Sequence, residues 1–219
     1  MKKIVTTGFL FFAMCAFAFA GTQQKTKSTK DEYKKVVTGR ADKIVKKMSF
    51  DNDETKTKVR DHIVGFYCDL NAIQDARDVR IKSVKNNAKT KKEKKEKQLK
   101  EKAGKKCEKV RDKFVAGLSK LISEEQIGQV KDGLTYGVAP KTFVAYKEMI
   151  PSLTEIQKAK IWEWLKEARE HAVIGGSSKE KHWWFGKYKG RINNYLSAEG
   201  YNIQAERKAW EERIKAQKK

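Results

Sequence analysis

Residues 175–201 hold the densest mixture of aromatic, cationic, amide and glycine residues in the sequence. Trp and Tyr side chains offer flat apolar faces, Lys and Arg offer charge-assisted hydrogen-bond donors, and Asn offers both a donor and an acceptor. Together these groups suit a polyhydroxylated or anionic ligand. The segment is therefore the first candidate for a binding site.

Helical geometry divides this segment into one apolar face and two polar faces. If residues 179–197 form a helix, each residue advances about 100° around the axis. The apolar stripe is expected to pack in a core, and its members are Trp184, Phe185, Tyr188, Ile192, Tyr195 and Leu196. The polar faces carry the predicted ligand-binding residues, which are Trp183, Lys187, Arg191, Asn194, His182 and Lys189.

Four of these residues have an expected role in holding a sugar. Trp183 would be the platform on which a sugar ring stacks. Lys187 and Arg191 would face carboxylate or hydroxyl oxygens, and Asn194 would fix the orientation of the ring. His182 stands at the start of the expected helix, where a capping or solvent-facing role explains it more simply than catalysis. No catalytic residue is assigned.

Tyr136 could complete a cleft, because it lies in the irregular segment 130–137, where small residues can admit a ligand. A core aromatic with a bonded hydroxyl is an equally good interpretation of Tyr136. Gly186 and Gly190 each cost about 1 kcal/mol relative to alanine in a helix interior. They predict close approach by a ligand or by another backbone, and helix packing explains them equally well.

The N-terminus has the pattern of a secretory signal peptide. Lys2 and Lys3 precede an apolar run that ends in Ala18-Phe19-Ala20, which predicts cleavage after Ala20. No later apolar run has the length of a transmembrane segment. The mature chain is therefore expected to be periplasmic or secreted.

Charge narrows the range of partners. Removing Lys2 and Lys3 lowers the formal net charge only from +22 to +20. Such a charge would favour nucleic acid as the partner of a cytosolic protein. Outside the inner membrane the available polyanions are acidic polysaccharides, lipopolysaccharide and phospholipid surfaces, so we expect an anionic carbohydrate and no nucleic acid.

Apolar residues recur at helical spacing and only Pro140 and Pro151 interrupt the chain, which predicts an all-α fold. We expect residues 21–30 to be disordered and residues 31–219 to form a single helical bundle of about six to seven helices. Its N-terminal part is expected to be a long helical hairpin that turns near residue 88.

The hairpin tip, residues 85–106, is rich in lysine. A solvated helix face explains such a run most simply, and docking on an anionic envelope surface is the alternative. The later helices are expected to begin at three capping boxes, whose first residues are Ser123, Thr154 and Ser177.

Two cysteines remain after processing, Cys68 and Cys107, and an antiparallel hairpin would bring them level. The exported compartment permits a disulfide. Helix axes lie about 8–10 Å apart, whereas a disulfide needs Cα atoms within about 7 Å, so the bridged and the free forms both stay open. The scattered histidines and the lack of a Cys-x-x-Cys pair predict no metal site, and no cofactor is expected.

Three motifs resemble a family of secreted bacterial proteins that is catalogued as a domain of unknown function and described as sugar-binding. The motifs are Val130–Gly137 (VKDGLTYG), Lys166–Glu170 (KEARE) and Phe185–Tyr201 (FGKYKGRINNYLSAEGY). The resemblance covers roughly residues 123–214. It implies a helical exported protein of bacteria that degrade polysaccharides, and it supplies no catalytic residues.

Three functions are compatible with these patterns. The first is carbohydrate binding, for an acidic polysaccharide or oligosaccharide, as an accessory to polysaccharide degradation. The second is a glycan-degrading enzyme, where a lyase fits the available Lys, Tyr, His and Arg residues better than a hydrolase that needs two carboxylates. The third is a periplasmic helical chaperone or stress protein, suggested by the Leu153-Thr-Glu-Ile-Gln157 motif.

Overall fold

The computed structural model describes residues 14–87 and 92–217, and the side chains of residues 30–86 and 92–217. These ranges contain eight helices and no strand, which confirms the all-α prediction and gives slightly more helices than expected. The helices are α1 (Met14–Val45), α2 (Asp53–Asn87), α3 (Lys92–Leu118), α4 (Glu124–Leu134), α5 (Val138–Met149), α6 (Glu155–Val173), α7 (Ser178–Ala198) and α8 (Ile203–Gln217).

The N-terminal helix differs from the prediction. Residues 21–30 belong to α1 instead of forming a separate disordered segment. The physical reason is that residues 14–38 contain no proline and one glycine, Gly21, so nothing in this stretch stops a helix. Residues 1–13 of the predicted signal peptide lie outside the described residues. No helix within the described ranges is long and apolar enough to cross a membrane.

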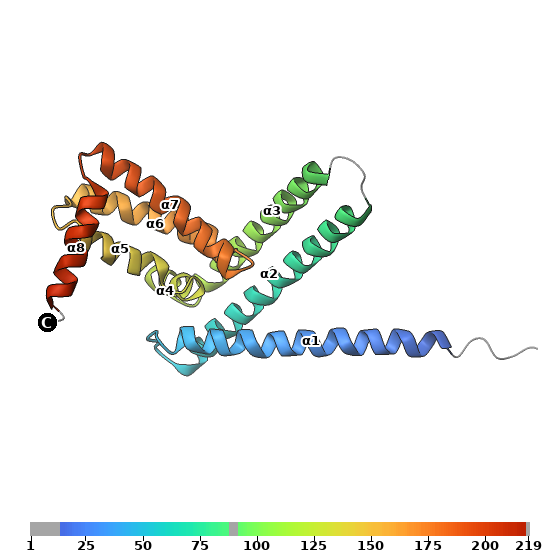
Figure 1. Ribbon diagram of the computed structural model, residues 1–219. Coiled ribbons are helices and arrows are strands. Elements are labelled where there is room, and N and C mark those ends of the chain that lie inside the picture. Colours follow the sequence, from blue (N-terminus) through green and yellow to red (C-terminus); the bar gives the residue numbers. More distant parts are fainter. Residues whose placement is uncertain (1–13, 88–91, 218–219) are drawn as a thin grey trace, which may run out of the picture.

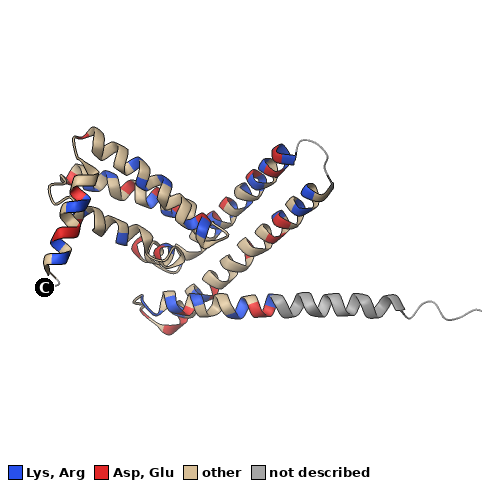
Figure 2. Ribbon diagram, viewed as in Figure 1, with Lys and Arg blue, Asp and Glu red and all other residues tan. Residues whose placement is uncertain are grey.

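The α2 and α3 helices form the expected antiparallel hairpin (Figure 1). The Phe66 and Phe114 rings stack between them, with centroids 4.2 Å apart and planes 11° from parallel. The predicted turn near residue 88 lies outside the described residues. Towards the tip, basic and acidic residues alternate along both arms (Figure 2), and the Glu96 carboxylate pairs with both Lys85 at 3.5 Å and Lys100 at 2.7 Å.

Cys68 and Cys107 are both free thiols, and the register of the hairpin explains this. Because Phe66 faces Phe114, Cys107 lies level with Ile73 rather than with Cys68. Five residues of helix separate these two levels by about 7.5 Å. Added to the distance between helix axes, this offset exceeds the reach of a disulfide.

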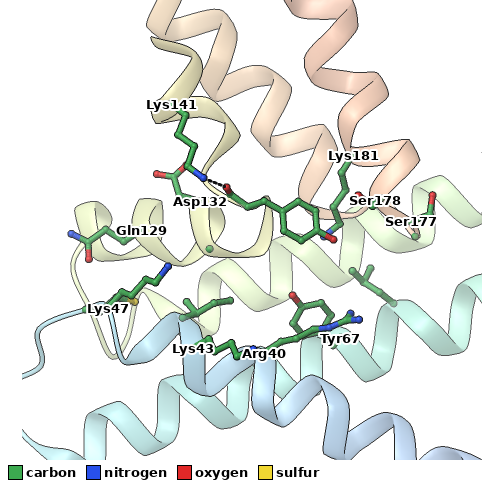
Figure 3. A pocket seen from close by; sticks show the side chains of 18 of the residues that line it. Arg40, Lys43, Lys47, Tyr67, Gln129, Asp132, Lys141, Ser177, Ser178 and Lys181 are labelled. Atoms are coloured by element: carbon green, nitrogen blue, oxygen red, sulfur yellow. Dashed lines mark hydrogen bonds between the residues drawn. The ribbon is translucent and has the colours of Figure 1, made fainter. Parts of the chain in front are cut away.

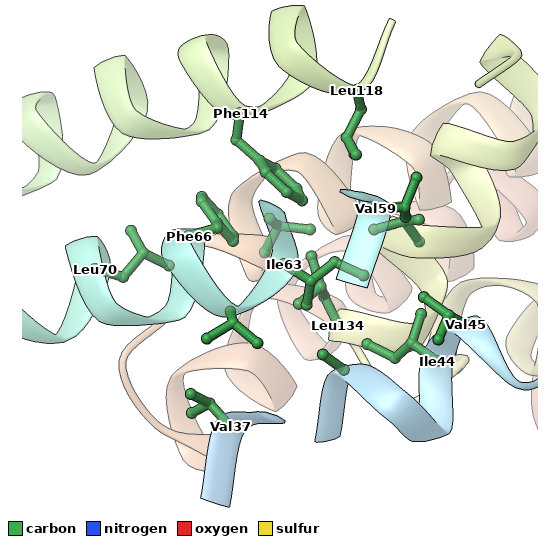
Figure 4. Packing of buried hydrophobic residues seen from close by; sticks show 14 of the residues in the cluster. Val37, Ile44, Val45, Val59, Ile63, Phe66, Leu70, Phe114, Leu118 and Leu134 are labelled. Carbon is green, nitrogen blue, oxygen red and sulfur yellow. The ribbon is translucent and has the colours of Figure 1, made fainter. Parts of the chain in front are cut away.

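The core has two parts. The first is formed by α1 to α4 and contains Val37, Ile63, Phe66, Phe114 and Leu118 (Figure 4). The second is formed by α5 to α8. It includes Phe185, Tyr188, Ile192 and Leu196, with Trp184 and Tyr195 packed against it, so the apolar stripe predicted for α7 is confirmed.

The α6 helix joins the two parts, because Val173 at its end belongs to the first core and Ala172 to the second. Two ion pairs reinforce the junction between α4 and α6: Arg169 with Asp132 at 2.9 Å, and Lys131 with Glu170 at 2.7 Å.

The predicted capping boxes position the later helices. Ser123 with Gln126 and Thr154 with Gln157 each form both reciprocal hydrogen bonds. Ser177 accepts from the backbone N–H of Glu180 at 3.1 Å, but the Glu180 carboxylate accepts from Gly176 N–H at 2.7 Å instead of from the cap residue. The start of α7 is thereby tied to the preceding glycine segment.

Helices α1 and α4 pack closely where Gly133 of α4 faces the side chain of Ile44 of α1. A Cβ atom there would lie 2.7 Å from Cγ1 and 2.8 Å from Cγ2 of the buried Ile44. These atoms sit next to the backbone of a β-branched residue and have little freedom to move. By contrast, a Cβ at Gly186 or Gly190 would meet no atom within 4 Å, so these two glycines mark open surface and not the expected close approach of a backbone.

We therefore expect opposite effects from two glycine-to-alanine substitutions. Gly133→Ala should lower the free energy of unfolding by about 1–3 kcal/mol, because it forces α1 away from α4. Gly186→Ala should raise it by up to about 1 kcal/mol, because alanine favours the helix and meets nothing. Urea denaturation of both variants measures this, and equal effects would contradict the assigned α1–α4 contact.

The free-thiol assignment predicts two reactive thiols in a chain that begins at residue 21 and therefore lacks Cys15. Purified without reductant and then denatured, the protein should give two equivalents in a thiol assay, from Cys68 and Cys107. A Cys68→Ser variant should give one. Absence of reactive thiols in the unreduced wild type, with recovery of two after reduction, would contradict the hairpin register.

Candidate functional site

A cavity of about 820 Å³ lies where α1, α2, α4 and the start of α7 meet. It has a size typical of small-ligand sites. Figure 3 shows Arg40 and Lys43 reaching it from α1, Lys47 from the turn after α1, Tyr67 from α2, Lys141 from α5 and Lys181 from α7. Residues from helices of both halves of the fold, α1 to α4 and α5 to α8, therefore surround one space.

The lining is strongly cationic. Five basic residues line the cavity, namely Arg40, Lys43, Lys47, Lys141 and Lys181. Asp132 is the one acidic residue among its described lining residues. The Asp132 carboxylate accepts a hydrogen bond from Arg169 at 2.9 Å, so it does not neutralise the lining cations. The cavity is therefore suited to a ligand with negative charge.

Lys181 is the buried cation of this group, with only 7% of its surface exposed. Its Nζ donates a hydrogen bond to the Leu134 carbonyl oxygen at 2.8 Å. It also lies 6.0 Å from the ring centroid of Tyr67 and 5.9 Å from that of Tyr136. Burial, and then the charge of Arg40, lower the pKa of Lys181 from 10.5 to about 8.

Three tyrosines contribute apolar faces and hydroxyl groups. Tyr33 donates to the Tyr67 carbonyl oxygen at 3.3 Å, and both side chains are half-buried. Burial raises the pKa of Tyr67 to about 12, so its hydroxyl stays protonated. Tyr136 is more accessible, with 52% of its surface exposed.

The backbone at Tyr136 adopts an unusual conformation, with φ of 61°. A bulky residue in this left-handed region is strained, and such strain concentrates at functional sites. The turn is held by a hydrogen bond of 2.7 Å from Gly137 N–H to the Asp132 carbonyl oxygen. Lys141 Nζ donates to the Tyr136 carbonyl oxygen at 3.3 Å. These contacts fix Tyr136 at the edge of the cavity.

Gly175 and Gly176 allow α7 to start against α2. A Cβ at Gly175 would lie 3.0 Å from Cγ of Lys181, and one at Gly176 would lie 2.7 Å from Oε1 of Gln74. The Gln74 amide donates to the Ile174 carbonyl oxygen at 3.1 Å, which ties this segment to α2. The glycine pair that opens the sequence motif thus lets Lys181 enter the cavity.

The predicted binding residues do not share this cavity. Of the seven, all within the described part of the chain, only Tyr136 lines it. His182 is exposed beside it, with its ring stacked 6.0 Å from that of Tyr136. The structure thus favours a site residue over a core aromatic for Tyr136.

The other predicted residues lie on the exposed surface of α7, outside the cavity. Trp183 is 59% exposed, and Lys187 Nζ lies 5.8 Å from its ring centroid. The Arg191 guanidinium lies 4.5 Å from the ring centroid of Trp164 and pairs with Glu167 at 3.2 Å. The side chains of Asn194 and Lys189 are exposed. Trp183, Lys187 and Arg191 thus form a ridge of aromatic and cationic groups on α7, and this α7 ridge is separate from the cavity.

Sequence reasoning did not identify three of the cavity cations, Arg40, Lys43 and Lys47. Arg40 and Lys43 are three residues apart and share one face of α1, and Lys47 follows four residues later in the turn after α1. That spacing was the available signal. The same reasoning did not single out Lys181, although it lies within the segment 175–201 that was the first candidate for a binding site. Across the described residues, no three His, Cys, Asp or Glu side chains come together in a way that could hold a metal ion.

The buried amine predicts a pH-dependent difference between the wild type and Lys181→Met. Below about pH 8 the amine is charged in the folded and the unfolded chain, so its burial cost is fully present. From about pH 8 to 10.5 the unfolded chain binds more protons, so the wild type gains stability relative to the variant as pH rises. Urea denaturation across this range measures the difference, and a constant difference would contradict the shifted pKa.

Comparison with known proteins supports the resemblance found in the motifs. Residues 34–216 match the family described as protein of unknown function (DUF3826), and this match covers α2 to α7 entirely, the C-terminal part of α1 and most of α8. No curated protein matches the sequence. Since the match spans most of the chain, the protein belongs to the DUF3826 family of proteins of unknown function.

Proposed function

We propose that the protein binds an acidic polysaccharide or oligosaccharide in the cavity between α1, α2, α4 and α7, as an exported accessory to polysaccharide degradation. The observation that carries this proposal is the lining, in which five cations and three tyrosines surround one space and the single acid is already paired with Arg169. Lys and Arg bind carboxylate or sulfate groups, and tyrosine faces and hydroxyls suit a sugar ring.

The positions of the lining residues indicate how a ligand would be oriented in the cavity. Arg40, Lys43 and Lys47 line one side and are exposed, so they can meet the charged groups of a chain that enters from solvent. Tyr136 is half-exposed near the buried Lys181, so a sugar ring can stack there with its polar groups towards the amine. Export of the chain, predicted from its N-terminus, would bring it to such glycans.

The charged lining favours this function over a chaperone role. A chaperone for unfolded chains needs an exposed apolar surface. Here the described lining carries five cations, and the Leu153–Gln157 motif is explained by the Thr154–Gln157 capping box. The outer α7 ridge around Trp183 remains the alternative location for a carbohydrate.

Two charge reversals distinguish these locations. Lys43→Glu changes the cavity lining, and Lys187→Glu changes the α7 ridge; both residues are exposed and both substitutions change the net charge equally. With oligogalacturonate as the probe, Lys43→Glu should weaken binding by about tenfold or more, equivalent to about 1.4 kcal/mol. Lys187→Glu should change it less than about twofold, apart from long-range electrostatics that salt screens.

The measurement is a titration of each variant at moderate salt, with methyl-esterified oligogalacturonate as the uncharged control ligand. The esterified chain should bind more weakly to the wild type than the free acid does. Loss of binding in Lys187→Glu with Lys43→Glu unaffected would move the site to the ridge. No binding of any acidic or neutral glycan on a broad array would contradict the proposal.

A further inference from the structure

The geometry points to a reaction at this cavity: we infer that Lys181 and Tyr136 form a catalytic pair that cleaves uronic-acid polysaccharides by β-elimination. This inference rests on the proposed binding of an acidic carbohydrate in the same cavity. It goes further, because it assigns a lyase activity, a substrate class and a role to each of two side chains.

Hydrolysis does not suit the cavity. Glycoside hydrolysis usually uses two carboxyl groups that flank the scissile bond. Asp132 is the single carboxylate among the described lining residues, and Arg169 holds it at 2.9 Å. Elimination needs different groups: cations that neutralise the uronate carboxylate, a base that removes the proton on C5, and an acid for the leaving oxygen.

The cavity offers all three. Arg40 and Lys43 from α1 can neutralise the carboxylate, which makes the neighbouring C5–H bond more acidic. Lys181 is an amine held in place by its hydrogen bond to the Leu134 carbonyl oxygen. The Tyr136 ring lies 5.9 Å from that amine and is half-exposed, so its hydroxyl can reach a ligand.

The surroundings of Lys181 favour a neutral amine. The charged and titratable groups that face it are Arg40 from α1, Tyr67 from α2 and Tyr136 from the turn before α5. On α4, the Asp132 carboxylate is paired with Arg169 of α6 and is not available to hold a proton on Lys181. With a pKa of about 8, the amine is partly unprotonated near neutral pH, as a general base requires.

The reaction balances without a co-reactant. The neutral Lys181 amine takes the proton from C5 of the uronate, and the electrons of that C–H bond form the C4–C5 double bond. The C4–O4 bond breaks, its electrons go to O4, and the Tyr136 hydroxyl gives its proton to that oxygen. The Lys181 ammonium then returns a proton to the Tyr136 phenolate through solvent. The products are an unsaturated uronate end and a chain with a new hydroxyl group.

The test uses the mature wild type and three variants. Lys181→Arg keeps a cation and cannot act as a base, because guanidinium does not lose its proton in proteins. Tyr136→Phe keeps the ring and removes the hydroxyl. Lys187→Arg, on the outer ridge, is the matched control. Polygalacturonate, alginate and glycosaminoglycans are the substrates, and binding, ultraviolet absorbance of unsaturated uronate and new reducing ends are measured separately.

We expect the wild type and Lys187→Arg to produce unsaturated uronate from at least one substrate, at a rate that rises up to about pH 8. Lys181→Arg and Tyr136→Phe should each lower the rate by about 100-fold or more and still bind the substrate. If Lys181→Arg does not fold, Tyr136→Phe carries the test alone, because its side chain is half-exposed.

Three outcomes overturn the inference. Binding without product on any substrate would leave the proposed function intact and remove the lyase activity. New reducing ends without unsaturated uronate would show hydrolysis instead. Unsaturated product that persists in both cavity variants would place the reaction elsewhere. Absence of binding by the wild type, in contrast, would contradict the proposed function itself.

Discussion

The buried ammonium of Lys181 is the interaction on which the rest of the site depends. It joins α7 to the end of α4 through the Leu134 carbonyl oxygen at 2.8 Å. Removing a charged amine from water costs free energy, which one hydrogen bond and two aromatic faces offset only in part. A buried charged group of this kind rarely stabilises a fold, whereas such groups are common in functional sites. The surrounding cations raise the cost further, because Arg40 also lowers the pKa of Lys181.

This constraint explains several local features together. Gly175 leaves room for the Lys181 side chain, since a Cβ there would lie 3.0 Å from its Cγ. The pairing of Arg169 with Asp132 keeps the one lining carboxylate occupied. The strained backbone of Tyr136 directs an aromatic ring to the same place. A bound anion would relieve the repulsion among these cations, so ligand binding and the stability of the junction should be coupled.

The sequence predicted the elements better than the site. Capping boxes located the starts of α4 and α6, and helical periodicity identified the buried stripe of α7, because both signals are local in the chain. The register between α2 and α3 could not be predicted from the sequence, because it depends on how Phe66 stacks on Phe114 and not on the position of the turn alone. The wheel of α7 correctly separated Phe185 from Trp183, but it could not show that Lys181, at the start of the helix, is buried against α4 and α2. A cavity made by residues 40, 136 and 181 exists only after α1, α4 and α7 have packed.

The location of a bound ligand is the most direct test of carbohydrate binding in the cavity. A crystal structure of the protein with an acidic oligosaccharide, such as oligogalacturonate, would show this location. We expect the uronate carboxylates to lie beside Arg40 and Lys43, with one sugar ring against Tyr136 near Lys181. A ligand bound on the outer face of α7 at Trp183, Lys187 and Arg191, with the cavity containing only solvent, would contradict it.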